Sequence, residues 1–128
     1  MAFVIQGLTF DTGALIALER SGKRMRDVFA AATAQRLPIT VPAPVLTEWW
    51  REPSKTNERI LRSVDIEQLT AHLAKLAGQA IKAVPQATAI DAIVMASAAQ
   101  RGDVVYTSDF EDLERLRTYF PNVRVLRA

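Results

Sequence analysis

The chain has 128 residues, of which 49% are hydrophobic and 23% charged. This composition excludes intrinsic disorder, and we expect one folded domain over residues 1–128. No apolar run approaches the roughly 20 residues of a membrane-spanning helix, so no membrane association is expected. The absence of cysteine excludes disulfides, thiolate metal sites and cysteine nucleophiles, which leaves metals with oxygen ligands. The N-terminus does not have the pattern of a signal peptide, and we expect a cytoplasmic protein.

The net charge of +2 conceals an arginine-rich composition. Sixteen basic residues face fourteen acidic ones, and twelve of the basic residues are arginines. The planar guanidinium group binds phosphate in a bidentate fashion, which suits arginine better than lysine to nucleic-acid contacts. A net charge near zero therefore does not exclude a nucleic-acid partner.

Hydrophobic periodicity predicts strands that alternate with helices. In chain order we expect a strand at 8–10, helices at 12–19 and 23–36, a strand at 38–41, helices at 45–51 and 57–62, a short strand ending at Ile66, helices at 67–84 and 88–101, a strand at 104–107, a helix capped by Ser108 and a strand at 123–126. This order is typical of a three-layer α/β/α sandwich with a central, mainly parallel sheet. In such sheets the functional groups gather beyond the carboxyl ends of the strands.

Two acidic residues follow predicted strands. Asp11 ends the first strand and Asp109 follows the fourth, so both lie at the same edge of the sheet if the strands are parallel. Asp112 adds a further carboxylate one helical turn along. The alternative interpretation is local, because Ser108 and Glu111 have the spacing of a capping box and early acidic residues complement the helix dipole.

Two more acidic residues occur in apolar surroundings. Asp91 lies in the predicted helix 88–101, which is apolar on nearly every side. It is either a capping partner of Thr88 or a carboxylate whose desolvation a cation offsets. Glu48 lies in the apolar stretch 45–50, where a surface glutamate is the simpler interpretation for that residue alone. If the four carboxylates converge, they repel one another, and a hard cation such as Mg²⁺ or Mn²⁺ relieves that repulsion. Carboxylate clusters of this kind support metal-assisted phosphodiester hydrolysis.

Four segments carry a family resemblance. They are Thr-Phe-Asp-Thr-Gly-Ala-Leu-Ile-Ala-Leu at 9–18, Thr47-Glu48, Ile-Asp-Ala-Ile-Val-Met-Ala at 90–96 and Val-Tyr-Thr-Ser-Asp-Phe-Glu-Asp-Leu at 105–113. In this order and spacing they resemble the motifs of PIN-domain ribonucleases, and within that family the VapC-type toxins of bacterial toxin-antitoxin pairs. The stretch 1–7 departs from the family pattern, because many such toxins begin almost directly with the first strand.

The resemblance implies a PIN-like domain that hydrolyses RNA with Mg²⁺ or Mn²⁺, acts as the toxin of a type II pair and is inhibited by a cognate antitoxin. It assigns Asp11, Glu48, Asp91 and Asp109 to the acidic catalytic set. The metal ligands that it implies are Asp11, Asp91, Asp109 and Asp112, and Thr12 and Thr107 take supporting positions. One alternative is a catalytically silent PIN-like module that binds RNA or protein. A receiver-type module is a second alternative, but the chain lacks an acidic pair adjacent to Asp11 and a lysine after the fifth strand.

Basic and aromatic residues are candidates for binding surfaces. Residues 20–62 contain nine basic and four acidic residues, which form either a solvated face or an RNA-backbone track that includes Arg24 and Arg26. Consecutive residues on a helix point about 100° apart, so one of Trp49 and Trp50 is expected in the core and the other nearer the surface. The two tryptophans either pack in the ordinary way or line a groove for a partner, which is the antitoxin or a second copy of the chain in a homodimer.

Overall fold

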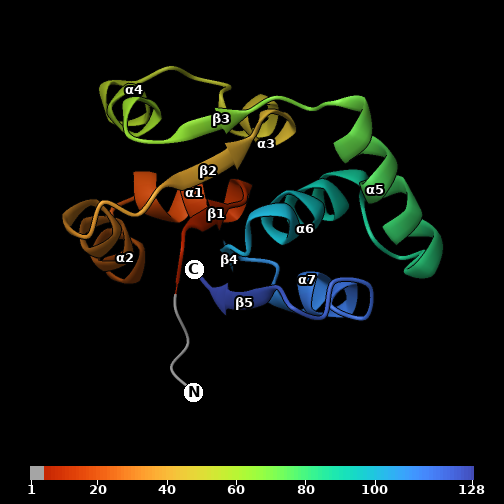
Figure 1. Cartoon of the computed structure of the whole chain (residues 1–128). Helices are drawn as coiled ribbons and strands as arrows, with labels where there is room; N and C mark the ends of the chain where they lie inside the picture. The colour runs from red at the N-terminus through yellow and green to blue at the C-terminus, as the bar shows by residue number, and fades with distance from the viewer. Residues whose placement is uncertain (1–4) are drawn as a thin grey trace.

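The computed structural model describes residues 5–128 and contains a five-stranded sheet flanked by helices (Figure 1). The strands are β1 (Leu8–Phe10), β2 (Ile39–Pro42), β3 (Asp65–Glu67), β4 (Val104–Thr107) and β5 (Arg124–Arg127). The helices are α1 (Thr12–Glu19), α2 (Lys23–Ala34), α3 (Ala43–Trp49), α4 (Lys55–Arg62), α5 (Ala71–Ala83), α6 (Ala89–Arg101) and α7 (Phe110–Leu116). The predicted α/β class is confirmed. Of the unusual stretch 1–7, residues 1–4 lie outside the described part.

The sheet reverses its strand order between β1 and β4. The order is β3-β2-β1-β4-β5 and every pairing is parallel, so the sheet is more uniform than the mainly parallel sheet we predicted. Helix α1 packs against α2, α3 and α4, whereas α6 packs against α5 and α7, which gives one helical layer on each face. Phe10 is in register with Tyr106, so β1 and β4 end side by side at the reversal point. Ligand sites of open parallel sheets lie at this position.

Helix α6 is the central element of the core. It contacts β1, β2 and β4, and every residue from 92 to 98 is buried. Thr88 caps its start, since its hydroxyl accepts the backbone N–H of Asp91 at 3.1 Å. Gly102 ends it with φ of +73°, a left-handed conformation that glycine adopts without a Cβ penalty. Among residues 5–128 no helix has both the length and the apolarity to cross a bilayer.

Several predicted boundaries were wrong. Helix α2 stops at Ala34 rather than 36, because Arg36 takes a φ of +56° that cannot continue the helix. Glu67 belongs to β3 and the following helix starts at Ala71, capped by Thr70. The predicted ranges of β1, α1 and β4 are confirmed at both ends, and most of the other elements differ from their predicted ranges by one or two residues. Apolar periodicity places an element along the chain, but capping and strand pairing set its ends.

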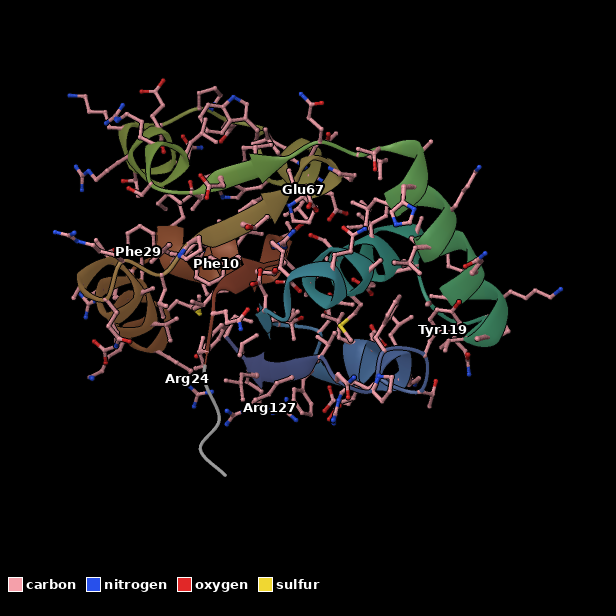
Figure 2. The ribbon with its side chains drawn as sticks, in the orientation of Figure 1. Phe10, Arg24, Phe29, Glu67, Tyr119 and Arg127 are labelled. Carbon is pink, nitrogen blue, oxygen red and sulfur yellow. The ribbon has the colours of Figure 1, made fainter. Side chains whose placement is uncertain are left out.

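A polar network that we did not predict ties α6 to the sheet. The Arg101 guanidinium donates to Glu67 Oε2 at 2.6 Å and to Asp103 Oδ2 at 2.9 Å. It also donates to the hydroxyls of Thr9 and Ser97, both at 2.9 Å. Glu67, labelled in Figure 2, lies at the end of β3, whereas Thr9 is in β1. One arginine therefore joins the helix to two strands and to the residue that precedes β4.

Candidate metal centre

Asp11 lies between β1 and α1 and is almost completely buried, with 4% of its surface exposed. Its Oδ1 accepts the backbone N–H of Ala14 at 2.8 Å, and its Oδ2 accepts the Thr107 hydroxyl. Asp11 is therefore the N-cap of α1, directly before the predicted helix start at Thr12. Thr107 Oγ1 in turn accepts the backbone N–H of Asp109 at 2.8 Å. One hydroxyl thus connects the acidic residue that follows β1 to the acidic residue that follows β4.

The capping box predicted at the start of α7 is absent from the structure. The N-cap is Asp109 rather than Ser108, and its side chain makes no capping hydrogen bond. Glu111 pairs instead with Arg127, at 3.1 Å. The capping-box interpretation was therefore wrong, because the Glu111 carboxylate pairs with Arg127 of β5. Glu111 and Asp112 still lie in the first turn of α7, where their charges complement the helix dipole as expected.

Three carboxylates from two helices meet at this edge of the sheet. Asp91 lies in the first turn of α6, and Asp109 and Asp112 lie at the start of α7. One oxygen from each lies within 4.8 Å of the other two. Oxygen ligands in this number suit Mg²⁺ or Mn²⁺, which bind carboxylates and complete their coordination with water and phosphate oxygens. The donor set therefore fits the cation that the sequence implied.

Two further residues join this group from α1 and α3. The Thr12 hydroxyl donates to Glu48 Oε1 at 2.6 Å, which fixes that carboxylate above the start of α1. The negative charge of Glu48 raises the pKa of the Asp11 carboxyl group. The structure thus brings all five predicted acidic residues to one edge, with Thr12 and Thr107 in contact with two of them.

Burial is the largest influence on Asp11 and raises its pKa from 3.8 to about 6. The hydrogen bonds from Thr107 and Ala14 lower the pKa, and the negative charges of Asp109 and Glu48 raise it. Desolvation, with a smaller contribution from the acidic neighbours, therefore outweighs the two hydrogen bonds and shifts the protonation equilibrium of Asp11 towards its neutral form.

Asp91 is less buried than Asp11 but behaves in the same way. Burial raises its pKa to about 6, hydrogen bonding with Thr88 lowers it, and the charges of Asp109, Asp11 and Asp112 raise it. The structure confirms Asp91 as a partner of the Thr88 cap and also places its carboxylate in the acidic group. A bound cation would remove the repulsion that raises both pKa values.

Gly13 is a part of this site that sequence reasoning missed. A Cβ on Gly13 would lie 2.5 Å from Ser108 Cβ and 2.6 Å from Ser108 Oγ. The first turn of α1 therefore approaches the loop that carries Asp109 more closely than any other residue type would allow. A glycine directly after Asp11-Thr12 was the available signal, since the first turn of a helix rarely needs one.

The predicted RNA-binding arginines are exposed on α2. Arg24 Nη1 donates to the backbone carbonyl of Arg127 at 3.5 Å, which brings α2 beside the end of β5. Arg26 is exposed two residues further along. The structure places Arg24, but not Arg26, against the strand that neighbours β4.

The two tryptophans divide as predicted into a buried and a more exposed one. Trp49 is 5% exposed, and its indole N–H donates to Glu19 Oε1 at 3.0 Å. Trp50 is half-buried and lines an open groove of about 430 Å³ with Leu46, Thr47 and Leu61. This groove lies between α3 and α4, on the helix that carries Glu48.

The close approach of Gly13 can be tested with two glycine substitutions. Gly13→Ala should reduce the free energy of unfolding by about 1–3 kcal/mol, because either α1 or the Asp109 loop must move. It should also weaken Mn²⁺ binding in calorimetric titrations. Gly78→Ala is the control, since nothing lies within 4 Å of its Cβ, and it should stabilise α5 by about 0.5–1 kcal/mol. Wild-type stability and Mn²⁺ affinity in Gly13→Ala would contradict the interpretation.

The raised pKa values predict how metal-free stability depends on pH. Between about pH 4 and 6 the folded state binds more protons at Asp11 and Asp91 than the unfolded state does, so stability falls as pH rises through this window. Asp11→Asn removes this cost and retains an N-cap, so it should stabilise the protein at pH 7.5 by up to about 3 kcal/mol. At pH 4 the stabilisation by Asp11→Asn should be small, because Asp11 is then already protonated in the folded state.

Urea denaturation in EDTA at both pH values measures this difference. Asp27→Asn is the control, because Asp27 is exposed and its bond to Lys23 lowers its pKa. That substitution should not stabilise the protein at pH 7.5. The interpretation fails if Asp11→Asn is less stable than the wild type at pH 7.5 without metal.

Comparison with known proteins identifies the fold. No family model matches the chain, and no curated protein sequence matches it significantly. A chain of VapBC2 from Rickettsia felis bound to promoter DNA is 13% identical with a TM-score of 0.76, over 94% of this chain and 98% of that one. A chain of DNA-bound VapBC from Salmonella typhimurium is 19% identical with a TM-score of 0.70, over 96% and 98%.

A chain of a toxin-antitoxin complex from Klebsiella pneumoniae is also 19% identical, with a TM-score of 0.62 over 94% of this chain and 96% of that one. These identities are low, whereas the shared architecture covers nearly every residue. The predicted resemblance is thus confirmed at the level of the fold. The chain has the PIN-like fold that is found in these VapBC and other toxin-antitoxin structures.

Proposed function

We propose that the protein is a Mg²⁺- or Mn²⁺-dependent endoribonuclease and the toxin of a type II toxin-antitoxin pair in the cytoplasm. The observation that carries the proposal is the convergence of carboxylates from separate segments at the reversal point of the sheet. They are Asp11 after β1, Glu48 on α3, Asp91 on α6, and Asp109 and Asp112 at the start of α7. The fold shared with VapBC structures supports the same assignment.

We assign Asp11, Asp91, Asp109 and Asp112 to metal binding. When bound, the cation supplies Lewis acidity at the scissile phosphate and makes a water molecule a better nucleophile. Asp11 is held on both oxygens, by Ala14 and by Thr107, and so presents its carboxylate in one orientation. Asp109 and Asp112 are exposed, which leaves the outer side of the site open to a long substrate.

Glu48 is assigned to orienting the attacking water. Thr12 fixes one of its oxygens, so the other can accept a proton from water. Thr107 is a positioning residue, because its hydroxyl aligns Asp11 and the backbone of Asp109 together. No protein nucleophile is needed in this scheme, which agrees with a chain that contains no cysteine.

The distribution of charge supports an anionic substrate. Without the five acidic residues of the site, nine acidic residues face sixteen basic ones, and the rest of the molecule carries +7. An acidic centre bordered by arginines can hold cations and still attract a polyanion. Arg24 and Arg26 on α2 are the proposed backbone contacts.

Cleavage of single-stranded RNA tests the proposal directly. The wild type should cut RNA in the presence of Mg²⁺ or Mn²⁺ and not in EDTA, whereas Asp11→Asn and Asp91→Asn should reduce the rate at least 100-fold, because each removes a ligand. Asp27→Asn, which removes an exposed carboxylate on α2, is the control and should cleave at the wild-type rate.

Gel analysis of end-labelled RNA gives the rates and the cut sites. Expression of the wild type should arrest growth, expression of Asp91→Asn should not, and the cognate antitoxin should restore growth. Binding of RNA without cleavage under all metal conditions would favour the catalytically silent module instead. Full activity in either Asp→Asn variant would refute the metal assignment.

We propose that protein partners bind away from the acidic site. The groove formed by Leu46, Trp50 and Leu61 presents apolar surface beside α4, and aromatic side chains of this kind often anchor interfaces. We assign it to the contact between two copies of the chain, with Trp49 behind it as a packing residue. The antitoxin is the second protein partner, as the VapBC and toxin-antitoxin neighbours suggest.

Sedimentation can test the dimer. The wild type should sediment as a dimer and Trp50→Ala as a monomer, with an unchanged circular dichroism spectrum, because Trp50 is only half-buried. Tyr119→Ala is the matched control, since Tyr119 is a half-buried aromatic residue that lines a different pocket beyond α7. Equal sedimentation of Trp50→Ala and the wild type as dimers would exclude this groove as the interface.

A further inference from the structure

We propose that Phe110 and Arg127 form a stacking subsite for a nucleobase of single-stranded RNA beside the metal centre. This inference deepens the proposed function and rests on it, since it assigns the residues that hold the substrate. Phe110 is the first residue of α7 and Arg127 the last residue of β5. Neither had a role in the sequence analysis.

The two side chains form a stacked pair. The guanidinium carbon of Arg127 lies 4.2 Å from the centroid of the Phe110 ring, over its face. Phe110 is half-buried, so its ring is held by the protein, whereas the Arg127 side chain is 56% exposed. One face of the guanidinium therefore packs against the Phe110 ring, while much of the Arg127 side chain remains exposed to solvent.

The pair borders the acidic group through the backbone. Phe110 directly follows Asp109, one of the three clustered carboxylates. Arg127 is in register with Thr107, the residue that bonds to Asp11 and to the backbone of Asp109. The backbone N–H of Ala128 donates to the Thr107 carbonyl at 2.8 Å, which keeps the end of β5 beside this loop.

A planar cation on an aromatic ring favours a nucleobase over a simple phosphate. Unstacked bases of single-stranded RNA stack on aromatic rings and on guanidinium planes, and this contact tolerates any base. Binding of a phosphate alone requires the guanidinium but no aromatic ring beneath it. The support from Phe110 therefore points to recognition of a flat group next to the phosphate that is cut.

Two neighbours define the edges of this subsite. Glu111 contacts Arg127 Nη2 at 3.1 Å and sets the plane of the guanidinium. Arg24 donates to the Arg127 carbonyl at 3.5 Å, and Figure 2 shows Arg24 and Arg127 on the same side of the molecule. A second arginine is thus available for the phosphate that follows the stacked base. The negative charge of Glu111 repels the RNA backbone, so removal of the Glu111 charge should not weaken RNA binding.

Fluorescence anisotropy in EDTA measures binding without metal-dependent cleavage. The probes are a short labelled single-stranded RNA and an abasic oligomer of the same length. Arg127→Gln and Phe110→Leu should each raise the Kd for the RNA about tenfold, and should change the Kd for the abasic oligomer less than threefold. Glu111→Gln should bind RNA as tightly as the wild type or more tightly.

Arg117→Gln is the matched control, because it removes another exposed arginine, one that pairs with Glu114 at the other end of α7. It should leave both Kd values within twofold of the wild type. Urea denaturation of each variant checks the fold, and Arg127→Gln remains informative if Phe110→Leu is unstable. The inference is overturned if Arg127→Gln binds RNA like Arg117→Gln, if it loses RNA and abasic oligomer equally, or if the wild type binds no RNA.

The test separates this inference from the proposed ribonuclease activity. Stack-dependent RNA binding by a protein that never cleaves RNA would support the subsite and refute the hydrolase. Metal-dependent cleavage with unchanged RNA affinity in Arg127→Gln and Phe110→Leu would support the hydrolase and refute the subsite.

Discussion

Repulsion among carboxylates is the constraint on which the rest of this structure depends. The parallel sheet brings the ends of β1 and β4 together, and each end is followed by an aspartate. Helices α3, α6 and α7 add further acidic residues at the same edge. Because like charges at this separation raise one another's pKa, the metal-free fold must hold them in place with neutral donors. The Thr12 and Thr107 hydroxyls and the Ala14 amide are those donors.

The elements that carry the acidic residues could be predicted because their signals are local. Asp11 follows a short apolar strand, and Asp91 lies in a helix so apolar that burial was the only outcome for residues 92–98. Parallel strands then place the two ends at one edge by a general rule of topology. The residue pattern therefore predicts a shared edge for Asp11 and Asp109, whereas the family resemblance was needed to add Glu48, Asp91 and Asp112 to the same group.

The contacts that align those residues could not be predicted, because they join distant segments. Nothing near Thr9 or Glu67 in the sequence indicates that Arg101 would bond to both. The capping box at Ser108 satisfied every local rule and was still wrong, because Arg127 of β5 offered the Glu111 carboxylate a tertiary contact instead. Gly13 carried a visible signal, but its partner in the fold lies 95 residues away.

The Arg101 network anchors one side of the acidic site to the sheet. Helix α6 is bonded through one guanidinium to β1, β3 and the start of β4, so Asp91 sits on an element that cannot shift without breaking several hydrogen bonds at once. Asp109 and Asp112 lie at the start of α7, a helix of seven residues in which Phe110 is half-buried and Leu113 is buried. Asp91 is therefore anchored to the sheet through the side-chain hydrogen bonds of its helix, whereas Asp109 and Asp112 are held through the packing of α7.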